Sequence, residues 1–280
     1  MAPSPSTTSN DIPKPKFRLH LDDLRHPGTR SFLAVVPDPL LTLETALQAI
    51  VKHLYTASQD GTSPPSFVPL IPPTQSVTLI IHDFDGLAYT TGNGSDKEIH
   101  ISLNYIQSRA ASQDPAGELE GVITHELVHC YQHTRPTSDQ QRASEENIIR
   151  DPPGGLIEGI ADFVRLKSGL SPPHWKRPYS SDERPAKWDQ GYQHTAYFLA
   201  WLEDVRAGIG SIGVVNDRLL RVGYVVESTK YVALQGDGEV PRESFWHAIF
   251  GVGVLQLWQE YGEYLDRSGE GNSGRGNWEV

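Results

Sequence analysis

The hydrophobic pattern of the first third of the chain is that of short β-strands. Apolar residues alternate with polar ones, or form short runs bounded by turn residues, at 17–21, 77–84, 87–91 and 99–103. Asp85-Gly86 and Gly92-Asn93-Gly94-Ser95 separate the last three segments, and both are typical turn sequences. The sequence therefore predicts a strand at 17–21 and a three-stranded meander over 77–103. The last strand of the meander would lie at a cleft edge and offer its backbone to an extended peptide.

Apolar residues recur at helical spacing in other segments. Helices are expected at 42–55, 115–133, 156–168, 189–206, 216–222 and 254–265. Thr42 suits the N-cap of the first helix, and Asp114 and Pro115 suit the N-cap and first position of the second. Residues 59–74 and 134–153 read as loops. Strands followed by helices, without strict alternation, indicate an α+β protein.

Length and composition indicate one globular unit. The chain has 280 residues, of which 38% are hydrophobic and six are Trp, which is enough for a substantial core. We expect a single domain over 16–266, a disordered tail at 1–15 and a flexible, Gly-rich tail at 267–280. We expect this domain to be a monomer.

Charge and the lengths of the apolar runs exclude several classes of partner. The net charge of −11 argues against nucleic acid and against an anionic membrane surface. No run of 18 apolar residues is present, so no membrane-spanning helix is expected. The N-terminus is rich in Pro, Ser and Thr and lacks the apolar stretch of a signal peptide, which favours a cytoplasmic location. Cys130 is the only cysteine, so no intramolecular disulfide can form.

The sequence Thr124-His125-Glu126-Leu127-Val128-His129 contains the motif HExxH. Histidines four positions apart lie on one face of a helix, so both imidazoles can bind the same metal ion. A zinc ion held in this way lowers the pKa of a bound water to roughly 7, and Glu126 would lie beside it as a general base. The motif alone also allows a pair of surface histidines without a metal.

A catalytic zinc site needs a third protein ligand, and the predicted helix at 156–168 offers one. Glu158 and Asp162 are four positions apart and therefore share a helix face. We interpret Glu158 as the third ligand and Asp162 as the acceptor that orients a zinc-binding histidine. Gly159 and Ala161 are small enough to let two helices approach closely. Two alternatives remain: Asp162 is itself the ligand, or Glu158, Asp162 and Arg165 form a solvated, internally paired face.

Three segments together resemble the basic secretory protein family, which comprises zinc metallopeptidases of plants, fungi and bacteria. They are 124–129, Pro153 to Leu166, and Trp188-Asp189-Gln190-Gly191-Tyr192, within a resemblance that extends from about Ile99 to Trp258. The resemblance implies a zincin-like fold, in which a small mixed sheet packs against the HExxH helix and a mainly helical half follows. It also implies a gluzincin-like site and an extracellular location as the alternative to a cytoplasmic one.

The predicted activity is zinc-dependent hydrolysis of peptide bonds, with a peptide or protein as substrate. Zinc on His125, His129 and Glu158 would polarise water and the scissile carbonyl, and Glu126 would move the proton. Tyr192 and His194 are candidates for the donor to the oxyanion; a core position is the alternative for Tyr192 and a surface position for His194. His133 is expected to interact with a helix dipole rather than with the metal, and His100 is given no role.

Two other classes of function fit the same residues. One is a zinc-binding defence or interaction protein of the same fold that lacks turnover. Its weakness is that an inactive protein has no need of Glu126. The other is a hydrolase of non-peptide amides or esters, which the predicted edge strand favours less than a peptidase.

Overall fold

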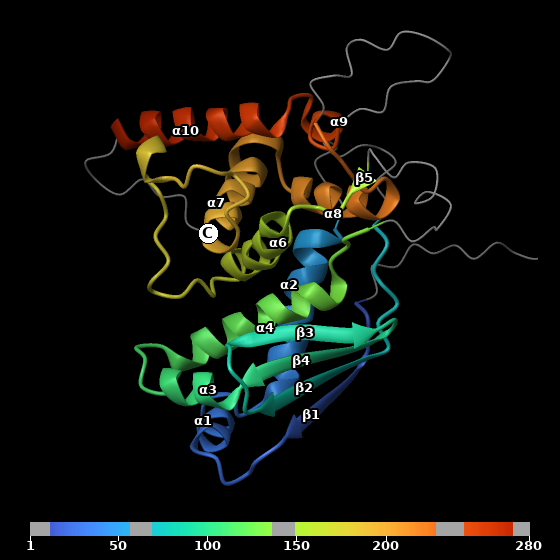
Figure 1. The fold of residues 1–280 in the computed structure, drawn as a ribbon, viewed down its shortest axis with the longest axis vertical. Helices are drawn as coiled ribbons and strands as arrows, with labels where there is room; N and C mark the ends of the chain where they lie inside the picture. Colours follow the sequence, from blue (N-terminus) through green and yellow to red (C-terminus); the bar gives the residue numbers. More distant parts are fainter. Residues whose placement is uncertain (1–11, 57–68, 136–148, 228–243, 271–280) are drawn as a thin grey trace, which may run out of the picture.

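The computed structural model describes residues 12–56, 69–135, 149–227 and 244–270. Figure 1 shows a sheet and its covering helices in the lower half of the molecule and a group of helices in the upper half. The predicted α+β class and the small mixed sheet are confirmed. Residues 1–11 and 271–280, which belong to the two predicted tails, lie outside the described residues.

The lower half contains a four-stranded sheet and four helices. The strands are β1 (Lys16–Leu21), β2 (Ser76–His82), β3 (Ala88–Asn93) and β4 (Asp96–Ser102). The helices are α1 (Pro27–Val35), α2 (Pro39–Leu54), α3 (Leu103–Arg109) and α4 (Pro115–Tyr131). The strand order is β1-β2-β4-β3, in which β1 pairs with β2 and β2 with β4 in parallel, while β3 is antiparallel to β4.

The predicted meander is wrong, because β4 lies between β2 and β3. Ile81 of β2 pairs with Ile101 of β4, and Thr90 of β3 pairs with Ile99 of β4. Asp85-Gly86 therefore belongs to a crossing connection and not to a hairpin. β4 takes an inner place because its isoleucines are fully buried, whereas β3 carries mostly exposed residues and suits an edge. The edge position predicted for 99–103 is therefore occupied by β3 instead.

One face of the sheet is part of the main hydrophobic core. Val77, Leu79, Ile81, Ile99 and Ile101 have no exposed surface and belong to the same buried cluster as apolar residues of α2 and α4. The opposite face carries His82 and His100, whose ring nitrogens lie 3.1 Å apart. Burying one face and solvating the other is the usual pattern of a sheet with antiparallel pairing.

The start of α2 differs from the prediction, and two further helices have no counterpart among the predicted ones. α2 begins at Pro39 because Asp38 Oδ1 accepts a hydrogen bond from Leu41 N at 3.0 Å, so Thr42 lies inside the helix and is not its cap. α1 and α3 were not predicted; the first is capped by His26 and the second by Ser102.

The upper half is mainly helical. Its elements are β5 (Ile149–Arg150), α6 (Gly154–Lys167), η1 (Ser181–Glu183), α7 (Tyr192–Trp201), η2 (Leu202–Ala207), α8 (Ser211–Arg221), β6 (Tyr224–Val225), α9 (His247–Phe250) and α10 (Val254–Glu270). α7 starts at Tyr192 and not at residue 189, because Gly191 turns the chain at φ +89°. The α-helix gives way at Leu202 to the π-helical segment η2. α10 continues to Glu270, beyond the predicted start of the tail at residue 267.

α6 and α7 approach closely at a glycine. A Cβ atom on Gly159 would lie 2.3 Å from Thr195 Cγ2, which is too close for any larger residue. The close approach predicted from the small residues of α6 is therefore confirmed. α6 also packs against α4, and this contact brings the two predicted halves of the site together.

Among the helices that the structure describes, none is by itself long and apolar enough to cross a membrane. The pair α1 and α2 reaches the required length and apolar composition only jointly, with a bend of 63° between the two helices.

Candidate metal centre and cleft

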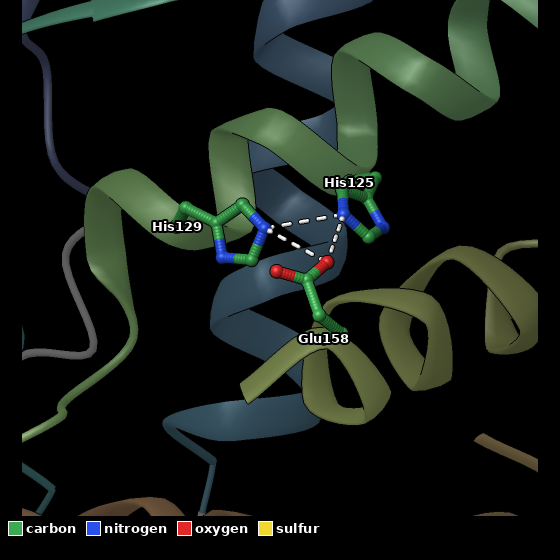
Figure 2. Close-up of side chains that lie close together, drawn as sticks. All are labelled: His125, His129 and Glu158. Atoms are coloured by element: carbon green, nitrogen blue, oxygen red, sulfur yellow. Dashed lines mark hydrogen bonds and ion pairs between the residues drawn. The ribbon is translucent and has the colours of Figure 1, made fainter. Parts of the chain in front are cut away.

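α4 presents its apolar side to the core and its two motif histidines to α6. Asp114 Oδ1 caps the helix by accepting a hydrogen bond from Gly117 N at 3.0 Å. The apolar side is formed by Leu119, Ile123, Leu127 and Cys130, each of which is at most 3% exposed. His125 and His129 extend from the helix toward α6 (Figure 2).

α6 brings Glu158 to these histidines. The Nε2 atom of His125 lies 3.1 Å from Glu158 Oε2 and 3.1 Å from His129 Nε2. The third separation, from His129 Nε2 to Glu158 Oε2, is 3.7 Å. Figure 2 shows the three side chains pointing at one another from the two helices. His125, His129 and Glu158 are therefore close enough to hold one metal ion.

The three separations fit tetrahedral coordination. Ligand atoms about 2.0–2.1 Å from a tetrahedral ion lie roughly 3.3 Å from one another. The separations of 3.1, 3.1 and 3.7 Å lie on both sides of this value. With three protein ligands, a tetrahedral ion would keep its fourth position for water or substrate.

Asp162 contacts the opposite side of the His125 ring. Its Oδ1 atom lies 2.6 Å from His125 Nδ1, and the residue is only 1% exposed. Burial by itself would lower the pKa of His125, but the hydrogen bonds to Asp162 and Glu158 raise it to about 9. For Glu158, burial favours the protonated form, yet the hydrogen bonds from His125 and His129 hold the pKa well below its usual range. The alternative of a solvated, paired face is wrong, because Asp162 and Arg165 are both buried.

Glu126 is held by the edge strand. The Thr90 hydroxyl lies 2.7 Å from Glu126 Oε2 and 2.9 Å from the backbone oxygen of the same residue. Glu126 is 6% exposed and lines the cleft beside His125 and His129, without being one of the three clustered ligands. The sequence predicted the edge strand at 99–103 and carried no signal that singled out Thr90.

Tyr192 lies over His125 in an unusual backbone conformation. Its ring is nearly parallel to the imidazole, at 15°, with 6.2 Å between the ring centres. Its φ of +48° is the only positive value among the described non-glycine residues, and such a conformation costs a bulky side chain on the order of 1–3 kcal/mol. The side chain is 58% exposed, so the core position that its helical spacing also allowed is wrong.

The turn before Tyr192 is fixed by contact with α6. A Cβ atom on Gly155 would lie 1.9 Å from the backbone oxygen of Asp189, and one on Gly191 would lie 3.4 Å from Gly155 Cα. The first turn of α6 therefore touches this backbone directly, and Tyr192 follows it immediately. The same helix that carries Glu158 and Asp162 thus sets where α7 and its tyrosine begin.

The cleft between β3 and these helices has a volume of about 750 Å³. β3 forms one wall with residues 88–92, α4 and α6 form the floor, and Tyr192 lies at the margin.

His194 and His133 are not among the residues that line the cleft. His133 lies beyond the end of α4, where its Nε2 donates to the backbone oxygen of Leu70 at 2.8 Å and burial lowers its pKa. Its interaction with the helix dipole stays a prediction.

Residues 14–261 match a sequence family described as peptidases of plants and bacteria (BSP). The chain belongs to this family. The peptidase family implied by the sequence resemblance is thereby supported over most of the chain. Comparisons with curated proteins and with solved structures gave no match.

In this peptidase family member, the cleft extends beyond the metal ligands to residues that the sequence did not identify. Tyr105, Glu118, Arg165 and Trp175 line the part of the cleft next to the first two turns of α4. They come from α3, α4, α6 and the loop after α6, so no local sequence pattern links them.

Proposed function

We propose that the protein is a zinc-dependent metallopeptidase that hydrolyses peptide bonds. The observation that carries this proposal is the convergence of His125, His129 and Glu158 beside Glu126, in a cleft of a chain from a peptidase family. The ligand set supports zinc, because two imidazole nitrogens and one carboxylate with an open fourth position are typical of catalytic zinc sites. When bound there, zinc would supply a Lewis acid that activates water and polarises the scissile carbonyl.

Glu126 would accept the proton of the attacking water and deliver it to the leaving amine. A general base must lie within hydrogen-bonding reach of that proton, and Glu126 borders the same cleft as the three ligands. The Thr90 hydroxyl, 2.7 Å from Glu126 Oε2, would orient the carboxylate. Asp162 would hold His125 in the tautomer with the proton on Nδ1, leaving Nε2 free for the metal.

A peptide substrate is supported by the position of β3. Its one strand partner among the described elements is β4, so its other edge is available to an extended chain. An extended peptide could add to this edge through backbone hydrogen bonds and pass over Glu126 and the metal ligands. This arrangement favours peptides over small amides or esters, which could not use the length of the strand.

Cleavage of a mixed peptide library is the direct test of the proposed function. Protein loaded with one zinc per chain is expected to cut peptides, as read by mass spectrometry, and protein stripped by a chelator is expected to be inactive until zinc is restored. The cut positions would also distinguish endo- from exopeptidase action. A zinc-loaded protein that cuts no peptide would contradict the proposal and favour a non-peptide hydrolase or a binding protein.

Replacing Tyr192 by Phe is expected to lower kcat about 10²–10³-fold, which is the usual cost of losing one donor to an oxyanion. The ring would remain over His125, so metal content should not change. The phenol can serve as a donor because the nearby Glu158 carboxylate raises its pKa and keeps it protonated. The matched control is Tyr179→Phe, which alters an exposed tyrosine outside the cleft. An unchanged kcat in Tyr192→Phe would assign the oxyanion donor to another residue.

Metal affinity is expected to rise with pH between 7 and 9, by up to about tenfold per pH unit. In the metal-free protein His125 holds a proton up to its raised pKa of about 9, and the metal must displace that proton. Glu158 is already ionised over this range and adds no slope. Calorimetric titrations in buffers of different ionisation enthalpy would count the released proton. No proton release between pH 7 and 8 would show that His125 is already neutral in the metal-free protein and would contradict the predicted pH dependence.

A further inference from the structure

One end of the cleft forms a pocket that the proposed hydrolysis does not use. We call it the arginine pocket, and define it by Tyr105, Glu118, Val122, Arg165 and Trp175, all of which line the cleft. It lies next to the N-terminal turns of α4, whereas the metal ligands His125 and His129 lie further along the same helix. Its chemistry can therefore act on the substrate without touching the metal.

Arg165 is a buried cation with incomplete pairing. The residue is 8% exposed, its Nε donates to the backbone oxygen of Leu170 at 3.0 Å, and its guanidinium carbon lies 5.2 Å above the Trp175 ring. Within the described part of the chain, no carboxylate lies within 4.0 Å of the guanidinium and its two Nη groups have no hydrogen-bond acceptor. A buried charge is costly unless it is paired, and among the described residues Arg165 has no direct ion-pair partner.

The neighbouring carboxylates are already engaged. Glu118 accepts a hydrogen bond from the Tyr105 hydroxyl at 3.0 Å and faces Arg109 Nε at 3.8 Å. Asp162, one turn before Arg165 on α6, contacts His125. Both carboxylates attract the Arg165 charge electrostatically, but among the described residues each forms its direct contact with another group and neither makes an ion pair with the guanidinium.

We propose that Arg165 is a specificity-determining residue that binds a carboxylate of the substrate. This inference rests on the proposed peptidase function, because it assigns one part of the peptide to the pocket. A planar guanidinium whose two Nη groups have no acceptor among the described residues suits a carboxylate, which it can bind with two parallel hydrogen bonds. The carboxylate could be an acidic side chain or the C-terminal carboxylate of a short peptide.

The location of the guanidinium sets where that carboxylate lies along the substrate. A Cβ atom on Gly121 would lie 2.5 Å from Arg165 Nε, so the guanidinium is level with Gly121, which lies one helical turn before His125. One turn is about 5.4 Å along the helix axis, and an extended peptide covers that length in about two residues. The carboxylate therefore belongs to one of the two residues next to the scissile bond on that side.

Two pairs of peptides distinguish the sources of the carboxylate. In the first pair, a peptide blocked at both ends carries Glu or Gln at the two positions next to the cut. In the second, a peptide without acidic residues ends two residues after the cut in a free carboxylate or in an amide. We expect kcat/KM to favour the carboxylate member by about 10- to 100-fold in one of the two pairs.

Three variants assign that preference to the pocket. Arg165→Gln is expected to remove the preference, and Glu118→Gln, which removes the negative charge beside Arg165, is expected to increase it. Arg206→Gln is the control, because it removes an arginine that pairs with Glu260 at 2.8 Å outside the cleft, and both ratios should stay as in the wild type. If Arg165→Gln does not fold, Glu118→Gln still tests the direction of the effect.

Binding separates this inference from the proposed function. The affinity of the same peptides for the Glu126→Gln protein, measured by fluorescence anisotropy, should show the same preference without any turnover. Cleavage or binding that shows no carboxylate preference in either pair would overturn the inference and leave the peptidase proposal intact. Carboxylate-selective binding that depends on Arg165, in a protein that cuts no peptide, would support the inference and contradict the peptidase proposal.

Discussion

Replacing Glu126 by Gln is expected to lower kcat by about 10²–10⁴-fold while the metal stays bound. General base catalysis contributes a factor of this size, and an amide cannot accept the proton that the carboxylate would take. Glutamine keeps the shape of the side chain and can still accept the Thr90 hydrogen bond. Initial rates on the best library peptide, with metal content measured by atomic emission, would test both parts of this prediction.

The matched control for that variant is Glu120→Gln, which makes the same change on α4 outside the cleft. Its rate and metal content should be close to those of the wild type. If Glu126→Gln loses its metal together with its activity, Glu126 is a ligand and the base must be sought elsewhere. If it keeps full activity, the proposed mechanism is wrong.

Replacing Glu158 by Ala is expected to weaken metal binding by more than 100-fold. Loss of a residue that only orients a ligand typically costs 10- to 100-fold, and loss of a ligand should cost more. Asp162→Asn is the comparison that separates the two roles, since Asp162 contacts His125 Nδ1 and not the converging Nε2 atoms. Competition with a chromogenic chelator would give both affinities, and Glu263→Ala on α10 controls for the loss of a carboxylate elsewhere.

The opposite order of effects would reassign the third ligand. If Glu158→Ala keeps one metal per chain at low free metal while Asp162→Asn loses it, Asp162 is the ligand and its contact with His125 is a feature of the metal-free protein. The proposed cleavage chemistry would survive that outcome. The geometry in which Glu158 Oε2 meets both histidines would then need another explanation.

Local periodicity predicted the site better than it predicted the sheet. His125, His129, Glu158 and Asp162 were placed from spacings of four within single helices, and one helix-to-helix contact then brought them together. The order β2-β4-β3 depends on which strands pair, including strands that are distant in the sequence. The Asp85-Gly86 signal predicts a local turn only, and it does not show that β4, which comes later in the chain, lies between β2 and β3. Turn sequences describe the chain locally, whereas pairing in this sheet is decided by how much apolar surface each strand can bury.

The residues around the ligands could not be predicted for a related reason. Thr90 contacts Glu126 because β3 takes the edge of the sheet, and Arg165 does not pair with Asp162 because that carboxylate contacts His125 of α4. Tyr192 is a further case, since its spacing fits an inward stripe but its positive φ turns the side chain to the cleft. Each of these positions depends on contacts between elements that are distant in the sequence.

The metal ligands come from both halves of the fold, two from α4 of the sheet half and one from α6 of the helical half. An ion held there would act as a cross-link between the two halves. Whether the halves unfold together would then depend on the free metal concentration. Because the ion binds only when both halves are docked, each tenfold rise in free metal above its Kd would add about 1.4 kcal/mol to their association. Sequestration of the metal would then weaken the packing of α6 and of the turn before Tyr192, which α6 contacts. Loss of the ion would therefore abolish the proposed hydrolysis and also destabilise this part of the fold.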